Sequence, residues 1–175
     1  GSHEFDAIVE AVVSGARPLA DDRGVKLSLR MDGSIPIYGD ATRVQQIIMN
    51  LLSNALKFTE RGGEVIVSLG LAGESAELSV RDTGVGMDKT LLDRAFQIFH
   101  QGGSTRRRQG GLGLGLAIAR ELAEAHGGSL AAASEGEGRG STFTLRLPRV
   151  AATARRPHHE LSPRGELDGL LALVV

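Results

Sequence analysis

The most informative segment of the chain reads Asn50-Leu51-Leu52-Ser53-Asn54-Ala55-Leu56-Lys57-Phe58-Thr59. An α-helix brings residues three and four apart onto one face, so Asn50, Asn54 and Lys57 would share a side. Carboxamide oxygens are hard ligands that suit Mg²⁺ without adding negative charge. This face therefore indicates a site for magnesium and a triphosphate. A polar helix face with ordinary asparagines is an equally good interpretation of this segment taken alone.

The other side of the same segment is apolar. Its hydrophobic residues recur at helical spacing and predict a buried stripe. Asp40 stands where a helix cap belongs, so the helix is expected from Asp40 to about Phe58. The stripe consists of Val44, Ile47, Ile48, Leu51, Leu52, Ala55 and Leu56.

Outward from this helix, the chain alternates between helical and extended patterns. Apolar spacing predicts further helices over 6–22, 88–95 and 114–126, the last ending at Gly127-Gly128. Alternation of apolar and polar residues predicts strands, and two pairs of them form hairpins. The predicted extended segments are 25–31, 35–38, 64–71, 76–81, 129–134 and 141–147.

A second motif, Asp82-Thr83-Gly84-Val85-Gly86-Met87, directly follows a predicted strand. A buried carboxylate at Asp82 could accept a hydrogen bond from the adenine amino group. Guanine presents an oxygen acceptor there, and two facing acceptors left unpaired are costly. Gly84 and Gly86 would let backbone approach the base. The alternative is a simple turn at the end of a strand.

A third motif, Gly110-Gly111-Leu112-Gly113-Leu114-Gly115-Leu116, leads into a predicted helix. Free backbone N–H groups and the dipole of that helix could face phosphates. The motif does not follow a strand, so it fails the context of a dinucleotide-binding fingerprint. A flexible loop with helix-entry glycines is the alternative interpretation.

Composition excludes several classes of function. The 175 residues are 41% hydrophobic and only 3% aromatic, so one domain with an aliphatic core is expected. The absence of cysteine excludes disulfides and thiolate metal sites. A net charge of −1 and the lack of any apolar run near the roughly 18 residues of a membrane span indicate neither nucleic acid nor direct membrane contact.

The two ends are predicted to lie outside the domain. Residues 1–5, Gly-Ser-His-Glu-Phe, read as a tag remnant and are left out of the fold prediction. Residues 149–175 read as a linker and tail, because proline, glycine and charge accumulate after Pro148. The apolar end of the tail is either the first strand of a receiver domain or a disordered or packed terminus.

Two further segments lie in order with these motifs. Arg94-Ala95-Phe96-Gln97-Ile98-Phe99 resembles the phenylalanine box of histidine kinases, and Gly140-Ser141-Thr142-Phe143 resembles their last glycine box. Over about residues 6–148 the chain resembles the GHKL ATPase superfamily and, within it, the histidine kinase catalytic domain. The resemblance implies the Bergerat fold, a two-layer α/β sandwich whose mixed, mostly antiparallel sheet carries helices on one face.

The resemblance also implies a site that binds ATP and Mg²⁺. Asn54 would be the magnesium ligand, Asp82 would bind adenine, and residues 97–113 would form a lid over the nucleotide. Asn50, Lys57 and Arg106 are the predicted catalytic residues. The predicted ATP-binding set is Asn50, Asn54, Lys57, Phe58, Asp82, Gly84, Gly86, Met87, Phe99, Gly111, Leu112, Gly113, Leu114, Gly115 and Thr142.

Four positions refine this expectation. Gyrase-like and chaperone-like relatives carry a water-activating glutamate where this chain has Asn50, and an amide cannot act as that base. Arg106, in the run Arg106-Arg107-Arg108, is expected to offset charge at the γ-phosphate, although a solvated charge run is the alternative. Leu112 and Ile98 replace a hydroxyl residue and a proline that are common in the family.

The resemblance therefore predicts a protein-histidine kinase fragment that donates the γ-phosphate of ATP to a histidine elsewhere. Expected partners are the histidine-containing dimerisation hairpin of the parent kinase and a response regulator or receiver domain. None of the five histidines of the chain is expected to be the acceptor. A monomeric, cytoplasmic fragment is expected, whether or not the parent kinase is anchored in a membrane. The alternatives are a non-catalytic, nucleotide-gated interaction module and a serine-directed anti-sigma kinase of the same fold.

Overall fold

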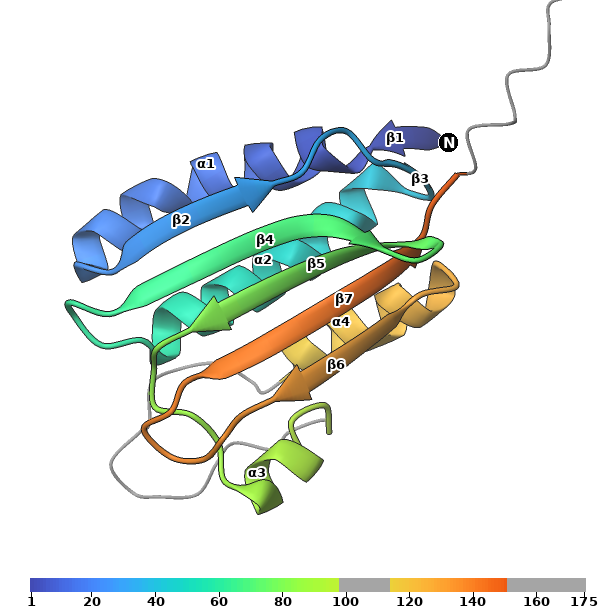
Figure 1. Ribbon diagram of the computed structural model, residues 1–175. Coiled ribbons are helices and arrows are strands. Elements are labelled where there is room, and N and C mark those ends of the chain that lie inside the picture. The colour runs from blue at the N-terminus through green and yellow to red at the C-terminus, as the bar shows by residue number, and fades with distance from the viewer. Residues whose placement is uncertain (98–113, 151–175) are drawn as a thin grey trace, which may run out of the picture.

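The computed structural model describes residues 1–97 and 114–150 of the chain. Helices and strands alternate along these residues, largely where the sequence predicts them (Figure 1). The helices are α1 (Phe5–Arg23), α2 (Ala41–Phe58), α3 (Lys89–Asp93) and α4 (Gly115–Ala125). The strands are β1 (Ser2–Glu4), β2 (Lys26–Met31), β3 (Pro36–Tyr38), β4 (Glu64–Ala72), β5 (Ser75–Asp82), β6 (Ser129–Ala133) and β7 (Ser141–Pro148).

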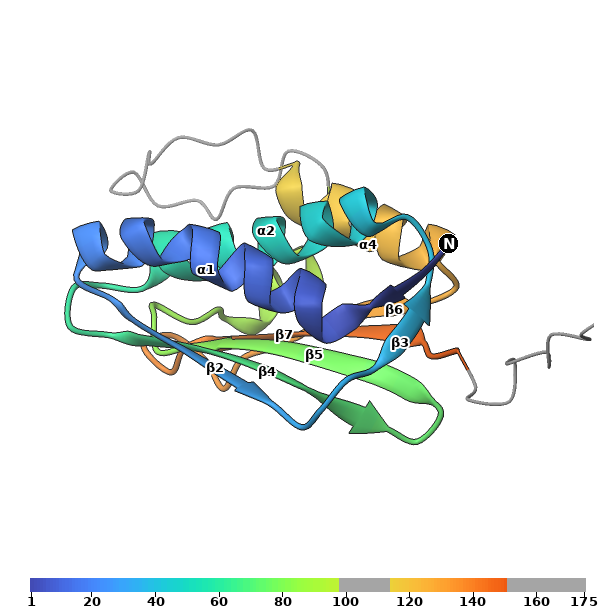
Figure 2. The same cartoon turned by 90° about the horizontal axis from the view of Figure 1, so that it is seen from above.

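Five strands form the main sheet in the order β2-β4-β5-β7-β6. β2 pairs with β4 in parallel, and the other three pairings are antiparallel. Figure 2 shows α1, α2 and α4 together on one face of this sheet. The architecture confirms the predicted two-layer sandwich with a mixed, mostly antiparallel sheet.

The core lies between the sheet and the helices, and it follows from the two periodicities in the sequence. Along β5, Ala76, Leu78 and Val80 are fully buried, while the residues between them face the other side. The apolar stripe predicted on α2 is at most 1% exposed at every position. The core is accordingly mostly aliphatic, as the composition predicts, with Phe5 and Phe143 as its buried aromatic residues.

The start of α2 is fixed by a side-chain cap. Asp40 Oδ1 accepts hydrogen bonds from the backbone N–H groups of Thr42, at 2.9 Å, and Arg43, at 3.3 Å. These N–H groups have no partner within the helix, so the cap stabilises the start of the helix. The predicted cap is therefore confirmed.

The N-terminal residues depart from the prediction. Ser2–Glu4 form β1, which pairs antiparallel with β3, and the Phe5 side chain is completely buried. Leaving residues 1–5 out of the fold was therefore wrong, because Phe5 supplies apolar area that a tag remnant was not expected to contribute.

In the part of the chain that the structure describes, no helix is long and apolar enough to cross a bilayer.

We predict that Phe5→Ala lowers the free energy of unfolding by about 3–5 kcal/mol, because it removes a buried ring and leaves a cavity. Urea unfolding followed by circular dichroism measures this change. Tyr38→Ala is the matched control, since that aromatic ring is 72% exposed and its loss should cost less than about 0.5 kcal/mol. Equal effects of the two substitutions would show that the N-terminal segment does not pack as described.

Candidate functional site

The predicted adenine-binding carboxylate is buried at the end of β5. Asp82 is only 5% exposed, and it pairs across the sheet with Ser141 of β7. Its Oδ1 atom accepts hydrogen bonds from the backbone N–H groups of Gly84, at 2.8 Å, and Ser141, at 3.2 Å. Both hydrogen bonds that described residues donate to this carboxylate go to Oδ1, so Oδ2 is the oxygen left for a ligand.

Burial raises the pKa of the Asp82 carboxyl group, and the two backbone hydrogen bonds oppose that rise without cancelling it. The charged form of Asp82 therefore lowers the stability of the folded domain. Perturbed carboxyl groups of this kind occur more often at functional sites than in ordinary cores.

The two glycines after Asp82 are required by close backbone packing. A Cβ atom on Gly84 would lie 2.3 Å from the carbonyl oxygen of Phe58 at the end of α2. A Cβ atom on Gly86, whose φ is +65°, would lie 2.1 Å from the carbonyl oxygen of Gly136 in the β6–β7 turn. The loop after β5 is thereby held between α2 and that turn, and Phe58 joins it directly to the polar helix face.

That polar face is formed as predicted. Asn50, Asn54 and Lys57 lie on α2, and each is partly exposed while the stripe on the opposite side is buried. The N-terminus of α4 meets this face, because a Cβ atom on Gly115 would lie 3.6 Å from Asn50 Oδ1. The Lys57 ammonium lies 5.1 Å from the ring centroid of Phe58. Gly115, the last glycine of the third motif, and Asn50, the first asparagine of the polar face, therefore come together in space.

The donor set suits a magnesium ion that is held mainly by phosphate. The described residues contain no group of three or more His, Cys, Asp or Glu side chains placed to hold a metal. Mg²⁺ usually takes one or two protein ligands and completes its shell with phosphate oxygens and water. A single carboxamide such as that of Asn54 fits this kind of magnesium site. A site in which protein side chains supply all the ligands does not fit the described residues.

One predicted adenine-site residue does not reach Asp82. Thr142 pairs with Arg81, so these two side chains lie on the face of the sheet away from the helices. Ser141 lies next to Asp82 instead and is 9% exposed. The sequence contains the signal that could have found Ser141, because Phe143, two residues further along the strand, belongs to the core and shares its face.

Other predicted residues lie around this centre. Met87 donates its backbone N–H to Ser134 Oγ at 3.0 Å, and Leu114 stands directly before α4. Phe99, Arg106, Gly111, Leu112 and Gly113 lie outside the described residues.

The phenylalanine box is anchored on the core by an aromatic contact. The rings of Phe96 and Phe143 meet edge to face, with centroids 6.4 Å apart and planes at 88°. The Arg120 guanidinium of α4 lies 5.5 Å from the centroid of the Phe96 ring. The residues directly before the predicted lid are thus attached to both the sheet and α4.

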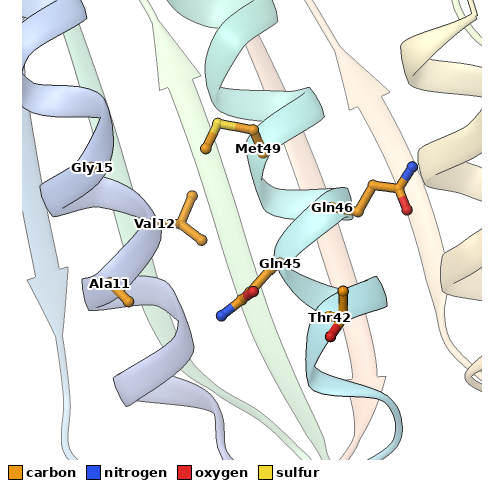
Figure 3. A pocket seen from close by; sticks show the side chains of 7 residues that line it. All are labelled: Ala11, Val12, Gly15, Thr42, Gln45, Gln46 and Met49. Carbon is orange, nitrogen blue, oxygen red and sulfur yellow. The ribbon is translucent and has the colours of Figure 1, made fainter.

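A hollow of about 480 Å³ lies elsewhere, between α1 and α2 (Figure 3). In Figure 3, the side chains of Val12, Gln45 and Met49 extend into the gap between these helices. None of the motif residues lines this hollow, and its walls offer no charged group. The chemistry therefore concentrates at the Asp82 end of the sheet and on the polar face of α2.

The family model described as histidine kinase-, DNA gyrase B-, and HSP90-like ATPase matches residues 39–151. The chain belongs to this family. The match includes α2, the Asp82 loop and α4, and so spans all three motifs found in the sequence.

Curated relatives of this ATPase family member are histidine kinases. The chain is 38% identical over 161 residues to the histidine protein kinase DivJ of Caulobacter vibrioides, covering 87% of this chain and 27% of that protein. It is 40% identical over 148 residues to the circadian input-output histidine kinase CikA of Synechococcus elongatus, covering 83% and 19%. It is 41% identical over 155 residues to the sensor protein TorS of Escherichia coli, covering 87% and 16%. The chain thus spans less than a third of each of these relatives.

Solved structures of histidine kinases share the fold. The mycobacterial sensor histidine kinase MprB aligns with a TM-score of 0.77 at 24% identity, covering 85% of this chain and 98% of that one. Full-length ShkA, solved in complex with AMPPNP, aligns with a TM-score of 0.74 at 29% identity, covering 87% of this chain and 31% of that one. The first comparison supports the fold alone.

We predict that Asp82→Asn raises the free energy of unfolding at neutral pH. The native pKa of Asp82 is raised, so the folded carboxyl group holds its proton more tightly than the unfolded one. The cost of burying the charge is then absent below the unfolded pKa of about 3.9 and grows as the pH rises through the native pKa.

The stabilisation by Asp82→Asn should therefore shrink as the pH falls toward about 4. Chemical denaturation at a series of pH values measures it, with the exposed Asp93→Asn as the matched control. A loss of stability that is the same at every pH would contradict the prediction.

Proposed function

We propose that this chain is the ATP-binding catalytic domain of a sensor histidine kinase. In this proposal it transfers the γ-phosphate of Mg-ATP to a histidine on a separate dimerisation hairpin. The observation that carries the proposal is the meeting of three features at one end of the sheet. They are the buried Asp82 carboxylate, the carboxamide face of α2 and the N-terminus of α4.

At the adenine end, Asp82 Oδ2 would accept a hydrogen bond from the adenine amino group. The orientation of the carboxylate supports this role, because the N–H groups of Gly84 and Ser141 hold Oδ1. Guanine would place a carbonyl oxygen opposite the carboxylate, and two unpaired acceptors in a buried site are strongly disfavoured. The domain should therefore select ATP over GTP.

At the phosphate end, the polar face of α2 and the start of α4 would hold the triphosphate. Asn54 would provide a carboxamide oxygen to Mg²⁺, while Asn50 and Lys57 would contact phosphate oxygens. The free N–H groups at the start of α4 would face the phosphates near Gly115. Bound Mg²⁺ would neutralise part of the charge that develops during transfer.

In the reaction, an imidazole nitrogen of the acceptor attacks the γ-phosphorus. The bond between that phosphorus and the bridging oxygen breaks, ADP leaves, and the imidazole loses its N–H proton to solvent. The chain contributes by holding the nucleotide in line, with Arg106 proposed to offset charge at the γ-phosphate. Asn50 cannot activate water, which supports transfer to an external nucleophile over hydrolysis.

The proposed setting is a phosphorelay within a longer protein. The acceptor hairpin would come from the parent kinase, and the phosphate would pass on to an aspartate of a response regulator or receiver domain. Strand β1 and Phe5 would belong to the catalytic domain together with residues 6–148, and residues 149–175 would form a linker and tail. The isolated fragment is proposed to be monomeric.

Calorimetric titration should give Mg-ATP binding that Asp82→Asn weakens at least about tenfold. Because the backbone N–H groups of Gly84 and Ser141 select the oxygen of the new amide, its NH₂ group would face the adenine amino group as a second donor.

Asn54→Ala should weaken the binding of ATP only when Mg²⁺ is present. Ser53→Ala, a neighbouring exposed position on α2, is the control and should bind normally. Binding that Asp82→Asn leaves unchanged would rule out the proposed adenine site.

Transfer itself is tested with γ-labelled ATP and the purified hairpin of the parent kinase. We expect label on the hairpin in a linkage that acid breaks and alkali leaves intact, as for phosphate on histidine nitrogen. At an ATP concentration below saturation, transfer should fall with Asp82→Asn and stay normal with Ser53→Ala. ATP binding without transfer would favour a nucleotide-gated interaction module, and alkali-labile label on a protein serine would favour the anti-sigma kinase class.

A further inference from the structure

His126, directly after α4, connects the two helices of the proposed nucleotide site at their far ends. Its Nδ1 atom lies 2.7 Å from the carbonyl oxygen of Leu122, in its own helix. Its Nε2 atom lies 3.2 Å from the backbone nitrogen of Asp40, the cap residue of α2. Because the Asp40 N–H can only donate, Nε2 accepts, and Nδ1 carries the proton that it donates to Leu122. A neutral imidazole in one tautomer satisfies both bonds.

The space around the ring is specific to this contact. A Cβ atom on Gly39 would lie only 2.4 Å from His126 Cδ2. Gly39 has no positive φ, so its backbone conformation does not require glycine. The missing side chain is what allows the imidazole to reach the backbone of Asp40.

The usual reason for a histidine at a helix end does not explain this geometry. A protonated imidazole is favourable near the C-terminus of a helix, where its charge meets the dipole. Protonated His126 would have a hydrogen on both nitrogens, and Nε2–H would then face the Asp40 N–H. The observed contacts therefore belong to a neutral ring that links two helices.

The contact between His126 and Asp40, here called the junction, has a counterpart at the other end of α4. Gly115 lies against Asn50 of α2, so the two helices meet both there and at the Asp40–His126 bond. At about 1.5 Å per residue, Asp40 and Asn50 are about 15 Å apart along α2, and Gly115 and His126 are about 16 Å apart along α4. Since both helices are short and stiff, a slide of α4 at one contact moves the other by a similar distance.

We infer that His126 is a positioning residue for the triphosphate end of the site. By fixing the C-terminus of α4 on the cap of α2, it sets the distance between Gly115 and Asn50 some 15 Å away. The inference rests on the proposed function, because that function gives the Gly115–Asn50 distance its importance. Displacement of about 1 Å at a reacting centre is enough to lower rates greatly.

Two amide substitutions separate the two bonds of the ring. His126→Asn places its amide at the distance of Nδ1, so it can keep the bond to Leu122 but cannot reach Asp40. His126→Gln places its amide oxygen at the distance of Nε2, so it can accept from the Asp40 N–H. Gly39→Ala reaches the same contact from the other side by displacing the ring, and it serves as the second disruptive variant.

We expect His126→Asn and Gly39→Ala to weaken Mg-ATP binding about tenfold in calorimetric titrations, and His126→Gln to restore it to within about twofold. Binding of AMP, followed by nuclear magnetic resonance, should change less than about twofold, since AMP lacks the outer phosphates. Equal losses for Mg-ATP and AMP, or no loss for Mg-ATP, would overturn the inference.

Two controls separate this role from lost stability and from failure of the proposed function. Leu27→Ala, on the far edge strand β2, lowers stability without touching the junction and should leave Mg-ATP affinity unchanged. In the nucleotide-free protein, His126→Asn should shift the amide resonances of Asn50 and Gly115, and His126→Gln should not. The unsubstituted domain could fail to bind Mg-ATP while these resonances still shift. That result would reject the proposed function but keep the inference that His126 sets the position of Gly115 against Asn50. Unshifted resonances would reject the coupling itself.

Discussion

The packing of α2 against the sheet is the contact from which the other features of the site follow. Its apolar stripe is almost completely buried, which fixes the rotation of the helix about its own axis. Once that rotation is set, Asn50, Asn54 and Lys57 must lie together on the opposite side. The same helix supplies the cap that contacts His126, the surface that receives α4, and the carbonyl oxygen of Phe58 that the Asp82 loop approaches.

The two ends of the proposed nucleotide site depend on different physics. At Asp82 a single carboxylate is kept in a buried environment that raises its pKa, so recognition of adenine there would come from the cost of an unpaired polar group. On α2 the polar groups are partly exposed, and recognition of phosphate and Mg²⁺ would come from charge and coordination. Phe58 adjoins both ends, since its carbonyl oxygen packs on Gly84 and its ring lies beside the Lys57 ammonium.

Local signals in the sequence were enough for most of the fold. The cap at Asp40, the stripe on α2 and the alternation along β5 each depend on neighbouring residues, and all three were predicted correctly. What the sequence did not predict concerns relations between distant segments. The contact of Ser141 with Asp82 depends on the pairing of β5 with β7, and these two residues lie 59 positions apart in the sequence. The strand at Ser2–Glu4 needs a partner more than thirty residues away, and the contact of His126 with Asp40 spans 86 residues. Neither leaves a trace in local periodicity.

The short strand β3 lies between the two places where the chain enters and leaves the folded unit. β1 pairs with one side of it, while Ile37 bridges to Arg149 and the Val150 N–H bonds to Pro36. Domains whose ends lie close together are easily inserted between neighbours in a longer chain. Here both ends are held by the three residues of β3, at the rim of the fold. Neighbouring segments of a longer chain would therefore join the unit side by side, at one place on its surface.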